Sequence, residues 1–371
     1  MRSRLERIRC ALATSSGAKE KRADETCARD QGTEMKTHIF TERELNSFLK
    51  DASQHTVCKL HISIACAMRI PKELPVFPRL QKLSLWTDDD NLPAYPTVLC
   101  ASALPCRQSL HLCGPGSAIS MYPIVLEGPF DQLQKLSIRG WSLFGEMRMA
   151  ALFQSKDSPC FPRLTELSLI FNNMDAEACL ALSRALQHQA CPSLSMLSLS
   201  SNCIGADGCA ALADAFKNKA CPHLWQLDLG GNTIRAEGAM ALADALKTKA
   251  CPDLAKLKLD GNSIGAEGTE ALASALQDQA CPHLTHLNLR ENNLRVQGCT
   301  ALAKALQDKV CPDLIHLFLD SNEIGDHRCQ ALGKALRDQA CPKLCNPIIL
   351  NSPSWITSSL STERRPEVMS P

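Results

Sequence analysis

Hydrophobic and polar residues follow two different spacings within one short stretch of the chain. Over residues 254–259 (Leu-Ala-Lys-Leu-Lys-Leu), leucines alternate with Lys256 and Lys258. A period of two places leucines on one face of a short strand and lysines on the other. From Ala266 to Gln279 apolar residues recur every three or four positions, which is the spacing of a helix with one buried face. The pattern therefore predicts a strand, a turn and a helix in succession.

This pattern returns every thirty residues through the second half of the chain, with units that begin at Cys191, Cys221, Cys251, Cys281, Cys311 and Cys341. A period of this length is typical of a solenoid. One unit alone cannot offset an ordering entropy of about 1.5 kcal/mol per residue, so the units must stack. Stacked parallel strands lie about 4.8 Å apart, whereas packed helices need about 10 Å. We therefore expect a curved α/β solenoid, a horseshoe with parallel strands on the concave face and helices on the convex face.

The chain contains twenty cysteines, a number that would suit a disulfide framework. Seven of them, however, occupy one position of the repeat, where a free cysteine packs as a small buried hydrophobic residue. The chain also contains no Asn-x-Ser/Thr glycosylation acceptor. We therefore expect core packing rather than bridges, and a protein of a reducing compartment, located in the cytoplasm. The seven residues are Cys160, Cys191, Cys221, Cys251, Cys281, Cys311 and Cys341.

The periodicity divides the chain into regions. Residues 1–36 show no periodicity and are predicted to form a disordered N-terminal tail. The capping-box sequence Thr-Glu-Arg-Glu at Thr41 predicts an N-terminal capping helix over residues 37–55. Residues 56–160 are interpreted as degenerate repeats and residues 161–350 as regular thirty-residue repeats. The remaining residues, 351–371, are predicted to form a disordered C-terminal tail.

The degenerate region keeps four strand signatures, spaced 23 to 27 residues apart and starting at Leu60, Leu83, Leu110 and Leu136. A proline-rich run over residues 92–105 predicts a loop in place of a helix. At the other end of the chain, Pro347 stands where the first leucine of a strand is expected. Proline cannot donate to a ladder, so the strand should end there or become an edge.

The consensus Leu-x-x-Leu-x-Leu-x-x-Asn, followed by Gly-x-x-Ala-Leu-Ala-x-Ala-Leu, resembles leucine-rich repeats of the ribonuclease-inhibitor type. This type occurs in ribonuclease inhibitor, in NOD-like receptor sensor arrays and in Ran GTPase-activating proteins. The resemblance is specific from Leu164 to Leu344 and loose from Leu60 to Cys160. It implies a structural ladder in which asparagine side chains bond the backbone of the neighbouring turn. The positions concerned are Asn172, Asn202, Asn232, Asn262, Asn292 and Asn322.

Function is expected on the concave face, because the exposed helix residues barely change between units while the inward strand positions differ. Aromatic groups tend to dominate protein interfaces, which favours Phe318, His316, Met196 and Trp225 as anchors. The charges of Asp260, Arg290 and Asp320, which lie on successive strands, are expected to neutralise one another. The alternative reading is drift at unconstrained surface positions. The predicted partner-binding residues are Met196, Gln226, Asp228, Lys256, Lys258, Asp260, His286, Asn288, Arg290, His316, Phe318 and Asp320.

Charge and motifs narrow the remaining classes of function. Lys plus Arg (40) nearly cancels Asp plus Glu (39), which argues against nucleic acid or a membrane surface as a partner. No apolar run approaches eighteen residues, and no phosphate-loop motif occurs. We expect no catalytic residues, cofactor or metal site. The sequence therefore predicts a non-catalytic protein-protein interaction module or scaffold. The alternatives are a small-GTPase regulator resembling Ran activators, although the tail lacks their acidic run, and a purely structural fragment.

Overall fold

The computed structural model describes residues 33–39, 57–64, 81–87, 97–100, 108–114, 124–127, 130–140, 146–153, 160–324, 330–337, 341–344 and 346–348. By its internal contacts the chain divides into two units, Met1–Gly32 and Thr33–Pro371. All described residues belong to the second unit. Residues 1–32 of the predicted N-terminal tail, residues 40–55 of the predicted capping helix and the predicted C-terminal tail lie outside the described residues.

Twelve of the described strands form one parallel sheet in which strands follow their order in the chain, with only β4 and β6 left out. Each pair of neighbouring strands in this sheet is parallel. The twelve strands are β1 (Thr33–Ile39), β2 (Val57–Ile64), β3 (Lys82–Thr87), β5 (Ser109–Cys113), β7 (Lys135–Arg139), β8 (Glu166–Ser168), β9 (Met196–Ser198), β10 (Gln226–Asp228), β11 (Lys256–Lys258), β12 (His286–Asn288), β13 (His316–Phe318) and β14 (Asn346–Ile348).

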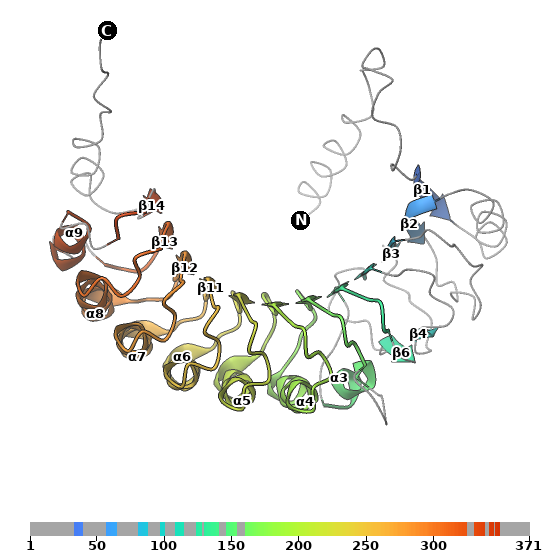
Figure 1. Cartoon of the computed structure of the whole chain (residues 1–371), viewed down its shortest axis with the longest axis horizontal. Coiled ribbons are helices and arrows are strands. Elements are labelled where there is room, and N and C mark those ends of the chain that lie inside the picture. Colours follow the sequence, from blue (N-terminus) through green and yellow to red (C-terminus); the bar gives the residue numbers. More distant parts are fainter. Residues whose placement is uncertain are drawn as a thin grey trace, which may run out of the picture. The chain divides into compact units, whose positions relative to one another are not determined.

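Helices alternate with the strands from β7 onward, and each packs against the next. Figure 1 shows the strands along the inner side of an arc and the helices along its outer side. This arrangement confirms the predicted α/β solenoid with a concave strand face and a convex helix face. The helices are α3 (Glu146–Leu152), α4 (Ala176–Gln187), α5 (Gly205–Lys217), α6 (Arg235–Lys247), α7 (Gly265–Gln277), α8 (Arg295–Gln307) and α9 (Gln330–Arg337).

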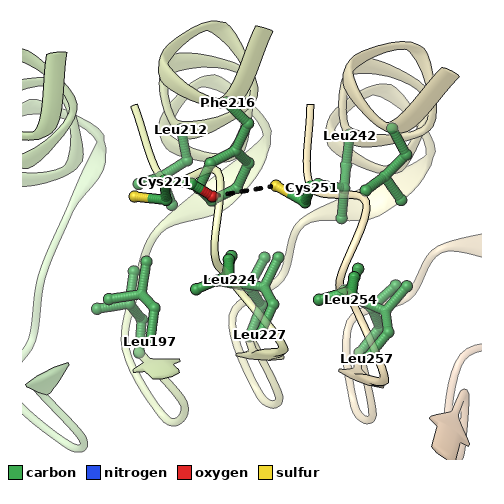
Figure 2. Close-up of a cluster of buried hydrophobic side chains, with 14 of the residues drawn as sticks. Leu197, Leu212, Phe216, Cys221, Leu224, Leu227, Leu242, Cys251, Leu254 and Leu257 are labelled. Atoms are coloured by element: carbon green, nitrogen blue, oxygen red, sulfur yellow. Dashed lines mark hydrogen bonds between the residues drawn. The ribbon is translucent and has the colours of Figure 1, made fainter. Parts of the chain in front are cut away.

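The leucines of each strand and the apolar residues of each helix share one core. In every strand from β8 to β13 the central leucine is buried between two partly buried residues. Figure 2 shows the leucines of successive units in parallel rows, with Leu212, Phe216 and Leu242 reaching toward them from the helices. The alternating pattern of the sequence therefore decides which strand side chains face the core and which face the concave side.

Glycine in the first helical turn lets neighbouring helices approach closely. A Cβ atom placed on Gly238 would lie 2.5 Å from Cγ2 of Ile234 and 3.1 Å from the Cα of Ala206 on the preceding helix. The equivalent Gly208 and Gly268 are crowded in the same way. Because helices are thicker than strands, a small residue here limits the divergence between successive units.

A ladder of buried asparagines holds the units in register, as the resemblance implied. The Nδ2 of Asn232 donates to the carbonyl oxygens of Leu199 and Leu229, both at 2.9 Å. Its Oδ1 accepts from the backbone N–H of Asn202 at 3.1 Å. Comparable bonds link the ladder as far as Asn322. Each asparagine therefore satisfies backbone groups of its own turn and of the preceding one.

The cysteines at the repeat position also pack in the core, as predicted. All seven are buried and form no disulfide. The Sγ of Cys251 lies 3.9 Å from the carbonyl oxygen of Cys221, as Figure 2 shows. Burial raises the pKa of the Cys251 thiol to about 12. Such a thiol stays protonated at neutral pH and acts as a small apolar side chain.

The degenerate region contributes strands in the same register as the regular units. Leu60 pairs with Leu83, Leu83 with Leu110, Leu110 with Leu136 and Leu136 with Leu167. The four strand signatures are therefore strands of the main sheet. Strand β14 ends the described sheet, and Pro347 pairs with Leu317 within it, in agreement with the predicted edge.

Two boundaries differ from the sequence prediction. Residues 33–39, which were divided between the tail and the capping helix, form strand β1, so the predicted tail and helix do not include this segment. The predicted loop at residues 92–105 contains strand β4 (Thr97–Cys100), which pairs with β6 (Ile124–Glu127) in a separate two-stranded sheet. Prolines flank this segment, but the residues between them, Thr-Val-Leu-Cys, include two β-branched residues, which favour extended backbone.

Candidate partner-binding face

Three columns of side chains run across the concave side of the sheet. The first column contains the first residue of each strand from β8 to β13, and the second contains the third residue. The strand register aligns them, since Lys256 pairs with Gln226 and His286. The third column lies two residues further along the chain. Among the predicted residues, the first column holds Met196, Gln226, Lys256, His286 and His316, the second Asp228, Lys258, Asn288 and Phe318, and the third Asp260, Arg290 and Asp320.

Side chains of the first and second columns on strands β8 to β13 are partly buried. The central leucines of the same strands point the other way, into the core. These side chains therefore form a closely packed surface rather than isolated projections. The structure thus brings the predicted residues of these two columns together on one face.

The second column contains one ion pair between neighbouring strands. The Nζ of Lys258 donates to Asp228 at 3.3 Å, and the Asp228 side chain is 13% exposed. This contact satisfies a carboxylate that would otherwise face a partner. Both charges are therefore engaged within the sheet.

The third column departs from the sequence prediction at Asp320. The Nε of Arg290 lies 2.6 Å from Asp320 and 3.1 Å from Glu291. Asp320 is only 5% exposed. The expected neutralisation of charge between Arg290 and Asp320 is present, but Asp320 is covered and a partner cannot contact it directly. Arg290, which is exposed, is the accessible member of the pair.

Asp260 bonds to a polar neighbour rather than to Arg290. Its Oδ1 accepts from the Nδ2 of Asn288 at 2.8 Å. A Cβ atom on Gly230 would lie 2.9 Å from the same oxygen, so the absence of a side chain there leaves room for the carboxylate. Burial raises the pKa of Asp260, with the backbone and Lys258 opposing this and the charges of Asp228 and Glu291 adding to it.

Aromatic and cationic groups gather on strands β10 to β13. The Nζ of Lys256 lies 4.9 Å from the ring centroid of Trp225. The rings of His286 and His316 are 4.5 Å apart, and those of His316 and Phe318 are stacked at 6.0 Å. We name these five residues, Trp225, Lys256, His286, His316 and Phe318, the aromatic–cationic strip. Trp225, whose place was uncertain from the sequence, belongs to it through this contact with Lys256.

The surroundings of His286 disfavour its protonated form. Burial lowers the pKa of His286, and His316, Lys256 and Lys258 lower it further. Burial and the three basic side chains therefore all act in the same direction on this ring.

The concave positions of the degenerate strands were not among the predicted partner-binding residues. Strand register continues the first column through Lys135 to Ser109 and Lys82, and the second through Ser137 to His111. Lys135 pairs with Glu166 at 2.5 Å. Burial lowers the pKa of His111, as do Lys82 and His61. The signal was present in the sequence, because each residue flanks a leucine in one of the four strand signatures.

Within the part of the chain that the structure describes, no group of three or more histidine, cysteine, aspartate or glutamate residues is placed to hold a metal ion. None of the helices described is both long enough and apolar enough to cross a membrane.

A family model described as Leucine Rich repeat matches residues 190–213, 220–243, 250–273 and 280–303. Each matched segment contains one strand, from β9 to β12, and most of the helix that follows it. No curated protein sequence matches the chain. The matched repeats, together with the parallel strands and helices into which they fold, show an α/β solenoid of leucine-rich repeats.

Proposed function

We propose that this chain is a non-catalytic protein-binding module whose partner docks on the concave face. Leucine-rich repeats are generic protein-interaction modules, which sets the broad class. The observation that supports the location is a contrast within each unit. The core leucine and the ladder asparagine repeat unchanged from unit to unit, while the first column changes from Met196 to Gln226, Lys256, His286 and His316.

The fold does not require this variation in the first column. Side chains of the first column point away from the core, so packing does not select their type. Drift could also vary them, but the rings of His286, His316 and Phe318 form a contiguous row, and Lys256 lies over the ring of Trp225. A closely packed group of aromatic and cationic residues is the composition found in interface hot spots.

The rigidity of the face also favours binding. Backbone ladders and buried asparagines fix the strands before any partner arrives. A preformed surface loses little conformational entropy on association, so more of the contact energy appears as affinity.

Affinity capture with matched variants tests this proposal. The tagged full chain is used as bait with its native extract, and bound proteins are identified by mass spectrometry. One variant replaces Lys256, His286, His316 and Phe318 with alanine. The control replaces four exposed residues of the convex helices, Lys217, Asp244, Glu270 and Lys304, with alanine.

Circular dichroism first establishes that both variants are folded. We expect the concave variant to lose the captured partner and the convex variant to keep it. Loss in the convex variant alone, or retention in both, would show that the concave face is not the binding site.

Three finer expectations stay predictions. The ribonuclease-inhibitor subtype is supported by the thirty-residue period, the helix in each regular unit and the asparagine ladder. Regulation of a small GTPase is tested by a single-turnover GTP-hydrolysis assay, in which an unchanged rate with each GTPase tried would discard it. Cytoplasmic location is tested by cell fractionation.

A further inference from the structure

We propose that the partner segment docking on strands β10 to β13 is acidic, with a carboxylate next to an aromatic or aliphatic side chain. This inference rests on the proposed function and specifies the chemistry of the partner. It follows from three properties of the aromatic–cationic strip: its unpaired positive charge, its histidine pair and its exposed rings.

The strip carries a positive charge that no carboxylate of the strip balances. The first column contains no carboxylate from Met196 to His316. Asp228 is held by Lys258, and Asp320 by Arg290. Lys256 forms no ion pair with any residue that the structure describes, and its ammonium group lies over Trp225 instead. A ligand carboxylate would therefore supply the charge partner that the sheet does not provide.

The histidine pair makes this preference depend on pH. His286 faces Lys256 and Lys258 on β11 and His316 on β13, all of which oppose its protonation. A bound carboxylate favours the protonated ring and so raises the histidine pKa in the complex. By linkage, affinity then increases as pH falls through the range in which His286 gains its proton, below the ordinary value of 6.5.

The rings give the strip an apolar part beside the charge. His316 and Phe318 stack with their planes inclined by 9°, and both are partly exposed. An aromatic or aliphatic side chain next to the ligand carboxylate can pack on this pair. A combined apolar and acidic motif therefore fits better than a simple polyanion.

The neighbouring charges argue against a nucleic acid in the same place. Asp228, Asp260 and Glu291 flank the strip on the second and third columns and the adjoining turn. A phosphate backbone would pass close to these carboxylates, whereas a short acidic motif can avoid them. We therefore propose an acidic peptide segment, and binding of nucleic acid is a result that would contradict the proposal.

Peptide display on the full chain tests the inference. A random library of peptides about twelve residues long is panned on the folded protein at low salt, and enriched peptides are resynthesised with a fluorescent label. We expect Asp or Glu next to an aromatic or aliphatic residue to be enriched. Anisotropy titration then gives the affinity of each peptide for the protein and its variants.

Charge-changing variants locate the binding. Lys256→Glu replaces an attraction by a repulsion and should weaken acidic peptides about tenfold or more. The matched control, Lys304→Glu on the convex helix α8, should leave affinity unchanged. The double variant His286→Gln and His316→Gln should remove most of the pH dependence between about pH 5.5 and 7.5.

The outcomes separate this inference from the proposed function. Enriched peptides that are neutral or basic, and that lose affinity on substitution of Met196 or Gln226, overturn the acidic partner but leave concave binding intact. Peptides unaffected by any concave substitution contradict both. A library without enrichment, or single-stranded DNA bound as tightly as the acidic peptides, also overturns the inference.

Discussion

The two halves of the solenoid share an inner face and differ in their outer layer. In residues 57–140 the strands β2, β3, β5 and β7 are five to eight residues long, whereas β8 to β13 have three residues each. The first half places β4 and β6 between these strands along the chain, and β6 contacts α3. The second half places a helix in every unit.

This difference shows that inner and outer layers are specified separately. The leucines keep one register through both halves, despite unequal spacing in the first. Units of 23 to 27 residues leave fewer positions for the outer layer than units of thirty. A strand pair about 4.8 Å apart matches the inner spacing, whereas helices about 10 Å apart do not. The wider spacing of helices therefore accounts for the curvature of the regular units.

Truncation of a core leucine should destabilise the protein by the same amount in either half. Leu83 and Leu227 are each 1% exposed. Replacement of either by alanine removes buried contacts and leaves a cavity, so we expect a loss of about 4 kcal/mol in the free energy of unfolding. Urea denaturation measures both. A loss for Leu83→Ala below about 1 kcal/mol would show that the leucines of the first half do not form an equivalent core.

The asparagine ladder should matter only in the regular half. Asn232→Ala removes the donors to Leu199 and Leu229 and the acceptor for the N–H of Asn202. These buried groups are left unpaired, and we expect a loss of about 3 kcal/mol. Asn218→Ala is the control, since its exposed side chain bonds only to the carbonyl of Asp214; it should cost less than about 1 kcal/mol. Equal losses in urea would contradict a special role for the ladder.

One glycine-to-alanine substitution tests the close approach of the helices, because the packing decides whether the substitution stabilises or destabilises the protein. Glycine to alanine inside an exposed helix usually stabilises by about 1 kcal/mol. At Gly238 the new methyl would meet Ile234 and the backbone of Ala206, so Gly238→Ala should instead destabilise by about 2 kcal/mol. Asp244→Ala, on the exposed face of the same helix, should change stability by less than about 0.5 kcal/mol. A rise in melting temperature for Gly238→Ala would show that the helices are less tightly packed.

The junction between the halves contains an ion pair that we expect to contribute little to stability. Lys135 on β7 and Glu166 on β8 are 49% and 35% exposed. Exposed pairs lose most of their attraction to solvent screening, so a double-mutant cycle of Lys135→Ala and Glu166→Ala should give a coupling below about 1 kcal/mol. A larger coupling, persisting in high salt, would show that this pair holds the two halves together.

The sequence predicted the sheet better than it predicted the outer layer of the first half. The strand at Leu83 was predicted because a period of two is a local property of the chain. Strand β4 was missed because the prolines near it suggested a loop, whereas its pairing with β6 is a contact between segments distant in the sequence. Strand β1 was missed for a similar reason, since its pairing with β2 is not visible in its own residues.

The candidate site was predicted residue by residue but not as a set of contacts. The columns followed from the repeat period, and Lys256, His286 and His316 indeed lie on successive strands. The sequence did not reveal that Asp320 is covered by Arg290. A near-neutral net charge also concealed the uneven distribution of charge, because Asp228 and Asp320 beside the strip are already paired with Lys258 and Arg290.

Local periodicity thus sufficed to predict the thirty-residue unit, its strand and helix, the buried leucines and cysteines, and the position of the asparagine ladder. These features repeat with the chain and depend on contacts that each unit makes in the same way. The ion pairs, the stacked rings of His316 and Phe318 and the burial of Asp320 emerged only from the folded sheet. They depend on which side chains of adjacent units reach one another, and that is decided by the stacking of strands far apart in sequence.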